Sequence, residues 1–580
     1  MHIGEDGSTV RRCNGAAPKM TENMTIDLLV VGSGTGLAAA LSAHEQGAGV
    51  LVIEKTDFVG GSTARSGGAF WIPANPVLDE FGANDSPEKA REYLTAVVDA
   101  TSPEPRWESF LEHGPDTVRM LERTTRMRFT WAKGYSDYHP ELPGGSPAGR
   151  SCECRPFDVA RLGRERARLR PAVMEAPLPM PVTGADYKWL NLMSKSPVRG
   201  FGVAIKRAIQ GIGGKLIGRE YAAGGRALAA GLFDGVVRAG IPVWTGAGLE
   251  RLLTDADGAV VGAVVTRDGR EITITARRGV VLAAGGFDHD LALRRSVQSA
   301  SLEDWSLGAD GNTGDAIRAA QELGAGVALM DQAWWFPAIS PLPGERPIVM
   351  LAERSLPGSF IVDDSGSRFL NEAEDYMSFG HDVLEREREG RPVGAMWLVF
   401  DQEYRNSYLL GGQVFPRMAL PKAWYEHGIA VRGSSWAELA EQMGVPAAAL
   451  GETARRFNEL AAAGADDDYG RGDSAYDRYY GDPTIAPNAN LRPLNPAGLY
   501  ALRVVLSDLG TCGGITADAE GRALAEDGTP IRGLYVIGNS AANVFGESYP
   551  GAGATIGQGL VYGHIVASHA MAAREVDAER

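Results

Sequence analysis

A short motif near the carboxyl end of the chain combines a phenol, a proline and two glycines. Tyr549-Pro550-Gly551-Ala552-Gly553 is rigid at the proline and open at the glycines. Such a segment could direct the phenol O–H of Tyr549 and the backbone N–H of Gly553 at one ligand oxygen. Two donors on one oxygen form an oxyanion hole, which stabilises charge developing on a carbonyl. The alternative is a simple turn before a C-terminal helix.

A glycine-rich loop near the amino end has the features of a dinucleotide site. The apolar run Ile26–Val31 enters Gly32-Ser33-Gly34-Thr35-Gly36, a small-residue helix follows, and a second apolar run, Val50–Ile53, ends at Glu54. In a βαβ unit such glycines let backbone N–H groups approach a pyrophosphate, and a carboxylate about 20 residues later binds the ribose. Leu37 stands where the third glycine of the usual pattern lies. A structural glycine turn is the alternative.

The segment that follows, residues 55–68, favours a flavin over a nicotinamide. Its paired glycines and small hydroxyl residues allow a bulky planar ring and its diphosphate to lie on backbone, which nicotinamide enzymes do not need here. The segment resembles the flavin-binding pattern of the fumarate reductase and 3-ketosteroid dehydrogenase flavoproteins; a turn-rich surface loop is the alternative. The cofactor contacts expected from it are Lys55, Gly60, Gly61, Ser62, Thr63, Ser66, Gly67 and Gly68.

Two distant segments support the flavin interpretation. Residues 278–287 form an apolar run that ends in small residues, after a predicted β-meander over residues 248–276. Residues 533–540 repeat the pattern near the carboxyl end, so the flavin domain is expected to be discontinuous. The cofactor contacts expected from these segments and from the following helix are Ala284, Gly285, Gly538, Asn539, Thr555 and Ile556.

These patterns predict an α/β protein in which a Rossmann-like FAD-binding domain carries an inserted α+β catalytic domain. The predicted helices of the insert are residues 436–443 and 447–463, followed by an acidic, turn-rich loop over residues 466–483. The predicted divisions are 1–23 as an N-terminal extension, 24–330 as the first part of the FAD domain with a basic insertion near 160–220, 331–506 as the catalytic domain, and 507–580 as the second part of the FAD domain.

Several separate motifs, in order along most of residues 24–572, make the chain resemble the 3-ketosteroid Δ1-dehydrogenases. A series of unlinked motifs is more specific than one glycine loop. The motifs are Asn312-Thr313-Gly314-Asp315-Ala316, Asp331-Gln332-Ala333-Trp334, Phe369-Leu370-Asn371-Glu372, Ser507-Asp508-Leu509-Gly510-Thr511 and Tyr549-Pro550-Gly551-x-Gly553. The resemblance implies a non-covalent FAD, a 3-ketosteroid substrate and a separate electron acceptor, a quinone or another compound.

The resemblance also implies catalytic roles. Tyr376 matches the base that removes a C2 proton, Tyr138 matches the tyrosine that supports this base, and Tyr549 with the N–H of Gly553 matches the pair that binds the C3 carbonyl, while a hydride leaves C1 for the flavin. The residue types suit this chemistry, because a tyrosine with a pKa of about 10 needs a second phenol to stabilise its phenolate. Tyr135 is a competitor for the role of Tyr138.

Alternatives remain open at this point. His139, His381 and His427 are rival bases. Other functions are desaturation at C4–C5 of a 5α-3-ketosteroid, a fumarate-reductase-like reaction on a dicarboxylate, and an electron-transfer subunit that holds a flavin without oxidising a steroid. A dicarboxylate site would need several arginines, whereas tyrosines at the matching places favour a neutral ketone.

Composition limits the class of protein. The 580 residues carry a net charge of −16, which argues against nucleic-acid binding, and contain no apolar run long enough to span a bilayer. Residues 1–23 lack a signal core, and the true start could be Met1, Met20 or Met24. The four cysteines fit neither a disulfide framework nor a zinc site, so we expect no metal and a cytoplasmic protein.

One segment differs from the acidic remainder of the chain. Residues 188–219 contain seven basic residues and no acidic one, and apolar residues recur at helical spacing, although Gly200, Gly202, Gly211, Gly213 and Gly214 weaken the helical pattern. This predicts either peripheral contact with the inner face of the cell membrane or a solvated surface element. A sterol substrate would dissolve in the bilayer, which gives the first interpretation a functional motive.

Overall fold

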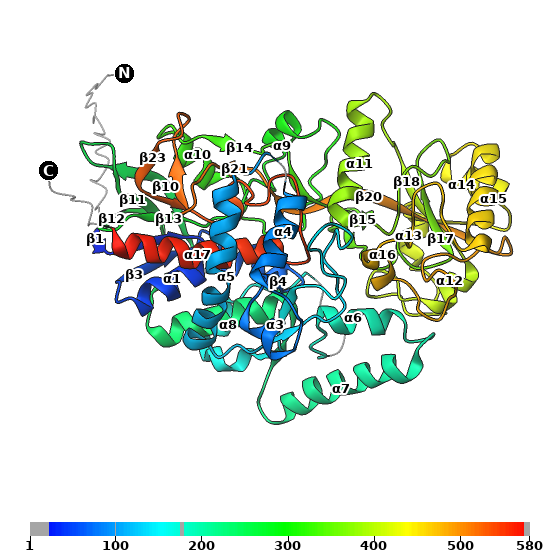
Figure 1. Ribbon diagram of the computed structural model, residues 1–580, viewed down its shortest axis with the longest axis horizontal. Coiled ribbons are helices and arrows are strands. Elements are labelled where there is room, and N and C mark those ends of the chain that lie inside the picture. The colour runs from blue at the N-terminus through cyan, green and yellow to red at the C-terminus, as the bar shows by residue number, and fades with distance from the viewer. Residues whose placement is uncertain (1–21, 99, 174–178, 574–580) are drawn as a thin grey trace, which may run out of the picture.

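The computed structural model describes residues 22–98, 100–173 and 179–573 (Figure 1). Its first large sheet has six strands in the order β22-β23-β13-β2-β3-β9. The four strands from β23 to β3 and the edge strand β9 run parallel, and β22 pairs antiparallel with β23. The strands are β2 (Leu28–Val31), β3 (Val50–Ile53), β9 (Val243–Trp244), β13 (Val280–Leu282), β22 (Arg522–Leu524) and β23 (Pro530–Val536).

Helices α1 (Gly36–Glu45), α8 (Gly224–Ala239), α17 (Ala554–Ala572) and α5 (Glu104–Thr124) pack together beside this sheet. The predicted helix after the glycine loop is confirmed. A Cβ on Gly36 would lie 2.9 Å from Cγ1 of Val30 and 3.0 Å from Cβ of Ala283. Gly36 therefore provides the close helix–sheet packing that a third glycine usually provides, while the Leu37 side chain is fully buried.

The predicted β-meander is confirmed and belongs to a four-stranded sheet, β1-β12-β11-β10. The predicted apolar strand of residues 26–31 is in fact two strands, because β1 ends at Ile26 and β2 begins at Leu28. β1 pairs with β12, so residues 22 and 23 of the expected extension are strand, and residues 1–21 lie outside the described residues. The strands are β1 (Glu22–Ile26), β10 (Ala247–Thr254), β11 (Val260–Arg267) and β12 (Arg270–Ala276).

A second large sheet forms the other half of the molecule, with the order β16-β15-β20-β18-β17 and β19 paired to β20. Its long strand β20 and its partner β15 extend toward the first half. The strands are β15 (Ala333–Ile339), β16 (Ile348–Val349), β17 (Ser359–Val362), β18 (Met396–Asp401), β19 (Ala430–Gly433) and β20 (Leu499–Thr511).

Helices cover this second sheet, and the two predicted helices are confirmed. The predicted acidic loop of residues 466–483 is wrong in part: it contains the short helix α16, and Asp466, Arg471, Asp477 and Asp482 are buried. All four side chains pair with partners inside the protein, which the local charge pattern does not reveal. The helices are α11 (Tyr376–Arg388), α12 (Gln402–Ser407), α13 (Lys422–Glu426), α14 (Trp436–Met443), α15 (Ala447–Ala463) and α16 (Ala475–Tyr479).

The basic segment forms two helices, α6 (Gly184–Asn191) and α7 (Pro197–Leu216). The expectation that glycines weaken the helix is wrong, because α7 runs for 20 residues. Three of the glycines face the protein: a Cβ on Gly211 would lie 1.4 Å from the carbonyl oxygen of Pro179, and Gly200 and Gly214 are similarly crowded. These glycines bring the helix close to the protein body, and Figure 1 shows α7 along the lower edge of the molecule.

Smaller elements connect these units. A three-stranded sheet has the order β4 (Ala69–Trp71), β6 (Ser151–Cys154) and β5 (Phe129–Trp131), and two strand pairs join β7 (Phe157–Asp158) to β8 (Tyr221–Ala222) and β14 (Val327–Ala328) to β21 (Gly514–Ile515). The short helices are α2 (Gly61–Arg65), α3 (Pro76–Glu80), α4 (Pro87–Val97), α9 (Leu291–Val297) and α10 (Asp315–Gln321). The 3-10 helices are η1 (Val159–Arg168) and η2 (Gly538–Ser540).

Candidate active site

Four parallel strands of the first sheet end at one edge, and the segments predicted to bind a dinucleotide follow them. Val31 of β2 pairs with Ile53 of β3 and Leu282 of β13, and Leu282 pairs with Val536 of β23. The segments after these strands therefore meet at the carboxyl edge, where α/β sheets bind ligands. The predicted cofactor residues found there are Gly32, Gly34, Gly36, Glu54, Ala284, Gly285, Gly538 and Asn539.

The glycines of the cofactor segments are of two kinds: some are required by a positive φ or by a close backbone contact, and others lie beside open space. Gly32 has φ +111°, and a Cβ there would lie 2.1 Å from the carbonyl oxygen of Ala283. Gly60 and Gly61 have φ +119° and +48°, which favour glycine. A Cβ on Gly67 would meet no atom within 4 Å. Exposed backbone beside open space fits a large planar cofactor with a diphosphate, so these residues fit FAD.

Glu54 organises the loops around the predicted ribose position. Its carboxylate accepts hydrogen bonds from the hydroxyl of Ser33 at 2.6 Å and the N–H of Thr56 at 3.0 Å. Lys55 points the other way and donates to the hydroxyl of Thr313 at 2.7 Å while pairing with Asp315 at 2.5 Å. The N–H of Ser33 and the hydroxyl of Thr56 donate to Glu54 as well, at 3.3 and 2.8 Å. A carboxylate can accept about four hydrogen bonds, so a ribose hydroxyl would bind Glu54 by replacing one of these donors. Lys55 connects the cofactor loop to the motif of residues 312–316.

Other predicted cofactor residues bind neighbouring segments. The Ser62 hydroxyl accepts from the N–H of Ala309 and from Nδ2 of Asn312, both at 2.9 Å. Oδ1 of Asn539 accepts from the Thr555 hydroxyl at 3.0 Å, which joins the end of the first sheet to α17. The remaining predicted residues lie on or beside α2 and in the first turn of α17: Gly60, Thr63, Ser66, Gly68 and Ile556.

The three predicted catalytic tyrosines lie together although they come from distant parts of the chain. The ring centroids of Tyr138 and Tyr376 are 5.3 Å apart, those of Tyr138 and Tyr549 are 5.1 Å apart, and those of Tyr376 and Tyr549 are 5.5 Å apart. All three side chains are buried. Trp334 packs on Tyr549 at 4.8 Å and Phe336 on Tyr376 at 4.7 Å, so β15 forms an aromatic wall of the cluster.

The electrostatics of the cluster distinguish the three phenols. Burial raises the pKa of Tyr376 well above its usual value, and contact with the Tyr138 hydroxyl lowers it in part. Burial also raises the pKa of Tyr138 well above the usual value, and its hydroxyl has no hydrogen-bond partner among the described residues. Such an orphaned buried hydroxyl is unfavourable unless a ligand or a neighbouring phenolate accepts its proton. A phenolate at Tyr376 would provide that acceptor.

Tyr549 faces the N-terminus of α17. Burial raises the pKa of Tyr549 to about 12, while the Tyr376 hydroxyl and the backbone N–H groups of Gly553 and Thr555 lower it. Gly553 is the N-cap of α17 with φ +92°, and a Cβ there would lie 2.3 Å from the carbonyl oxygen of Ala69. The phenol of Tyr549 and the N–H of Gly553 therefore converge, and the positive end of α17 favours negative charge at this point.

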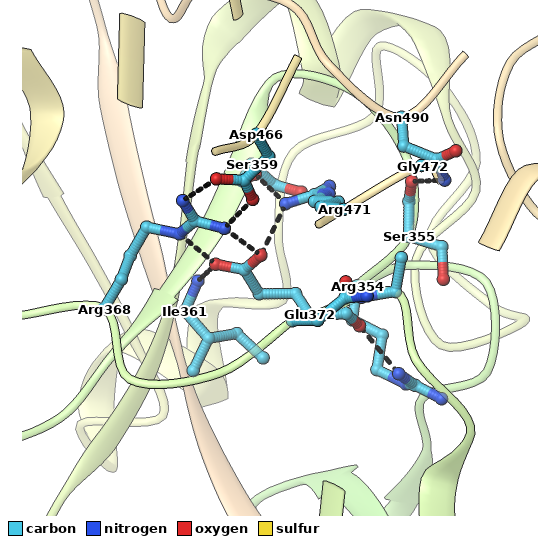
Figure 2. A network of polar contacts seen from close by, with 12 residues as sticks. Arg354, Ser355, Ser359, Ile361, Arg368, Glu372, Asp466, Arg471, Gly472 and Asn490 are labelled. Carbon is cyan, nitrogen blue, oxygen red and sulfur yellow. Dashed lines mark hydrogen bonds and ion pairs between the residues drawn. The ribbon is translucent and has the colours of Figure 1, made fainter. Parts of the chain in front are cut away.

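Tyr376 begins α11, and a network of buried charges holds the segment before it (Figure 2). Arg354 donates to the carbonyl oxygens of Glu372 and Glu374, each at 2.6 Å. The Glu372 carboxylate accepts from Arg368 at 2.7 Å and from Arg471 at 3.1 Å. The side chains of Arg354, Glu372 and Arg471 are fully buried. The network fixes the backbone that carries Tyr376.

The structure places four further tyrosines behind Tyr138 that the sequence did not identify as a group. The Tyr135 ring stacks on Tyr479 with centroids 4.7 Å apart, and lies 6.5 Å from Tyr138. Tyr476 packs on Tyr138 at 4.8 Å, and Tyr480 packs on Tyr135 at 5.5 Å. The ring of Tyr138 contacts that of Tyr376, whereas the ring contacts of Tyr135 among the described residues are with Tyr138, Tyr479 and Tyr480. The signal in the sequence was the tyrosine spacing of residues 476–480, hidden within an acidic segment.

The rival histidines have other contacts. Nε2 of His139 lies 4.0 Å from Oδ2 of Asp375, and Nε2 of His381 lies 3.0 Å from Oε1 of Gln332. His427 follows α13, where its N–H donates to the carbonyl oxygen of Ala423. These contacts do not involve Tyr138, Tyr376 or Tyr549.

Comparisons with known proteins agree with this geometry. Residues 27–556 match the family described as FAD binding domain. The chain is 43% identical to the 3-oxosteroid 1-dehydrogenase of Mycobacterium tuberculosis, over 94% of this chain and 98% of the relative. It is 34% identical to the 4-oxocyclohexanecarboxylate 2-dehydrogenase of Sinomonas cyclohexanicum, over 94% and 92%.

A solved structure gives the same result. The 3-ketosteroid delta1-dehydrogenase of Sterolibacterium denitrificans, in complex with 1,4-androstadiene-3,17-dione, superposes with a TM-score of 0.88 at 37% identity, covering 94% of this chain and 99% of that chain. The predicted fold class and the predicted family are confirmed. The chain belongs to the 3-oxosteroid 1-dehydrogenase family of FAD-binding proteins.

Proposed function

We propose that this protein uses FAD to introduce a double bond between C1 and C2 of a 3-ketosteroid. The observation that carries the proposal is the buried cluster of Tyr138, Tyr376 and Tyr549 at the N-terminus of α17. Proton removal next to a ketone requires a base and a stabiliser for the developing enolate. The cluster provides both in a site from which water is largely excluded.

Each residue has a separate role in this proposal. The O–H of Tyr549 and the N–H of Gly553 donate to the C3 carbonyl oxygen and stabilise its developing negative charge. Tyr376, as the phenolate, takes the proton from C2, and the Tyr138 hydroxyl donates to the Tyr376 oxygen and so favours the phenolate. When bound, FAD accepts the hydride that leaves C1, so that C2 loses a proton, C1 loses a hydride and the alkene forms.

The same proposal assigns FAD to the carboxyl edge of the first sheet. The loop of residues 32–36 would hold the diphosphate, Glu54 the ribose, and residues 60–68 the remainder of the cofactor. We also propose that residues 24–330 and 507–580 form the FAD domain around a catalytic domain of residues 331–506. The second sheet takes its strands from residues 333–511, which supports an insert of about this extent, although β20 crosses the proposed boundary after residue 506.

An anaerobic single-turnover experiment tests this function. Purified protein with FAD is mixed with 4-androstene-3,17-dione, the absorbance of oxidised flavin is followed, and the product is identified by NMR. Bleaching with a new C1–C2 double bond is the expected result, and a double bond elsewhere would contradict the proposed position of reaction. If 4-oxocyclohexanecarboxylate bleaches the flavin and no steroid does, the result would favour the dehydrogenation of that compound, which is the activity in the name of the Sinomonas relative. We propose that a separate electron acceptor, a quinone or another compound, completes the cycle.

We further propose that α7 rests on the surface of an anionic membrane. Among the described residues no helix is long and apolar enough to cross a bilayer. The helix α7 instead exposes an apolar face beside basic residues, a pattern typical of helices that lie in the membrane interface. Val198 is 88% exposed and Leu216 is 84% exposed. The exposed apolar residues are Val198, Phe201, Ile205, Ile209, Ile212, Leu216 and Ile217.

The opposite face of α7 anchors the helix to the protein. Nε of Arg207 donates to Oδ2 of Asp186 at 2.7 Å, and the crowded glycines lie on the same side. Flotation with anionic liposomes tests the contact: the protein should float at low salt and be released at high salt. The variant Ile205→Gln/Ile209→Gln should lose flotation, whereas Met418→Gln, which changes an exposed apolar residue elsewhere, should keep it. A protein that stays unbound at low salt would disprove the contact.

A further inference from the structure

The serine in the first turn of α2 has a hydroxyl proton that no protein group accepts. The Ser62 oxygen accepts hydrogen bonds from the N–H of Ala309 and from Nδ2 of Asn312, both at 2.9 Å. A hydroxyl has two lone pairs and one proton, so these two contacts fill its capacity to accept. Its own O–H has no acceptor among the described residues. The proton therefore points away from Ala309 and Asn312.

Asn312 fixes the direction of this hydroxyl. One hydrogen of Nδ2 goes to Ser62, and Nδ2 also donates to Oδ2 of Asp288 at 2.6 Å, which uses both of its hydrogens. The backbone N–H of Asn312 donates to the carbonyl oxygen of Ala309 at 2.9 Å, so one loop supplies both donors to the serine. Gly285 leaves room for the amide, because a Cβ there would lie 2.6 Å from Oδ1 of Asn312.

Asp288 is held in turn by a segment far along the chain. Its Oδ1 accepts from the N–H of Thr511 at 3.0 Å, and the Thr511 hydroxyl accepts from the N–H of Phe287 at 3.1 Å. The side chains of Asp288 and Asn312 are buried. Asn312 and Thr511 each belong to a motif that this chain shares with the 3-ketosteroid Δ1-dehydrogenases. These two motifs therefore meet at Asp288 and act together on Ser62.

The first turn of α2 borders the glycine loop of residues 32–36. A Cβ on Gly61 would lie 3.6 Å from Cα of Gly34, and a Cβ on Gly34 would lie 3.2 Å from Oγ1 of Thr63. Ser62 stands between Gly61 and Thr63 in the chain. Its hydroxyl therefore belongs to the turn that adjoins the loop proposed to hold the diphosphate of FAD.

We propose that Ser62 donates a hydrogen bond to a phosphate oxygen of FAD, and that Asn312, supported by Asp288, positions the hydroxyl for this bond. This inference rests on the proposed function, since it concerns the same cofactor. A charged phosphate oxygen accepts hydrogen bonds and forms stronger ones than a neutral acceptor does. Because both lone pairs of Ser62 are occupied, the serine meets the phosphate as a donor.

Dilution of the holoprotein measures the contribution of the serine. The dissociation constant of FAD is obtained from the flavin fluorescence of serially diluted protein. Ser62→Ala should weaken FAD binding about tenfold, a difference of about 1.4 kcal/mol, whereas Ser62→Thr keeps the hydroxyl and should remain close to wild type. The control Ser296→Ala removes a hydroxyl that donates to the carbonyl oxygen of Leu293, and it should bind FAD as the wild type does. Wild-type affinity in Ser62→Ala would overturn the proposal.

A double-variant cycle separates positioning by Asn312 from a general effect on the fold. Asn312→Ala should weaken FAD binding in the wild-type background. It should cause no further loss in Ser62→Ala, because the hydroxyl that it positions is already absent. Additive losses would show that Asn312 supports the fold and does not act through Ser62. The melting temperature of each variant checks folding, and Asn312→Leu, which is closer in shape to asparagine, replaces Asn312→Ala in the cycle if that variant does not fold.

Competition identifies the part of the cofactor that Ser62 binds. ADP carries a diphosphate and adenosine lacks it, so the ratio of the adenosine and ADP inhibition constants for FAD binding measures the contribution of the diphosphate. This ratio should fall about tenfold in Ser62→Ala and should not change in Ser296→Ala. An unchanged ratio together with weaker FAD binding would overturn the assignment to a phosphate. A wild-type protein that does not bind FAD would instead contradict the proposed function.

Discussion

The rings of Tyr138 and Tyr376 meet edge to face, with centroids 5.3 Å apart and planes at 81°. One residue follows β5 in the first half of the molecule, and the other begins α11 over the second sheet. The contact therefore depends on how the two halves pack, and it places a buried phenol donor beside the proposed base. The pKa of Tyr376 responds to this contact, because the Tyr138 hydroxyl lowers it while burial raises it.

Removing the base should abolish most of the activity. In Tyr376→Phe the ring remains to pack against Phe336, but no oxygen can take the C2 proton. We expect kcat to fall by about 10²–10⁴-fold, the usual contribution of a positioned general base. Flavin content and steroid binding, measured by absorbance and by equilibrium titration, should remain near wild type. A variant that keeps more than a tenth of the wild-type kcat would exclude Tyr376 as the base.

Removing the supporting phenol should move the pH profile rather than abolish activity. Tyr138→Phe loses the hydroxyl that lowers the pKa of Tyr376, so this pKa rises further. Because the phenolate is the active form, the rising limb of kcat/KM should shift to higher pH, and activity at neutral pH should fall more than activity at alkaline pH. Tyr135→Phe is the matched control: Tyr135 raises the pKa of Tyr376, so its loss should not move the limb to higher pH. An identical shift in both variants would contradict the distinct role of Tyr138.

Removing one donor to the carbonyl should lower kcat, and because Tyr549 raises the pKa of Tyr376, it should shift the rising limb of the pH profile to lower pH rather than to higher pH. Tyr549→Phe keeps the ring contacts with Trp334 but deletes the O–H. Loss of one oxyanion donor typically lowers kcat by about 10²–10³-fold. Product analysis should still give the C1–C2 alkene, because the base is intact. An unchanged kcat would show that the ketone binds elsewhere.

Much of the fold followed from local sequence patterns, whereas the environment of the site did not. Apolar runs and glycines predicted the four central strands of the first sheet, β2, β3, β13 and β23, and the helix at residues 36–45, and helix periodicity predicted α14 and α15. The break at Asp27 was missed because both sides of it are apolar. The burial of Asp466 and Arg471 could not be read from the chain, because it depends on pairing with Arg368 and Glu372 from a distant segment.

Two glycines of the cofactor region should respond differently to the same substitution. Gly32→Ala forces a Cβ to 2.1 Å from the carbonyl oxygen of Ala283 at φ +111°, so it should lower the melting temperature of the FAD-free protein. Gly67→Ala meets no protein atom within 4 Å, so it should fold normally and weaken FAD binding about tenfold, or about 1.4 kcal/mol. Wild-type FAD affinity in Gly67→Ala would contradict the assigned position of the cofactor.

The buried charge network behind Tyr376 should contribute to stability in a pH-dependent way. Although burial alone would raise it, Arg368 and Arg471 hold the pKa of Glu372 below its usual value. A depressed pKa means that the folded state binds fewer protons than the unfolded state. The stabilisation is therefore present above the unfolded-state pKa of about 4.3, and it is lost as the pH falls through the lower folded-state pKa.

Glu372→Gln removes this charge and leaves Arg471 buried without an equivalent anion. We expect a loss of about 3–5 kcal/mol at neutral pH, as for other broken buried pairs, measured by chemical denaturation. The difference from wild type should begin to narrow below about pH 4, where Glu372 is protonated in the unfolded state, and it should be smallest below the lower folded-state pKa, where Glu372 is protonated in both states. The exposed pair of Arg391 with Glu389 provides the control, and Glu389→Gln should cost less than about 1 kcal/mol. Because the network fixes the backbone before Tyr376, kcat per folded molecule should also be lower in Glu372→Gln than in wild type. Equal kcat values would show that the network stabilises the fold without positioning Tyr376.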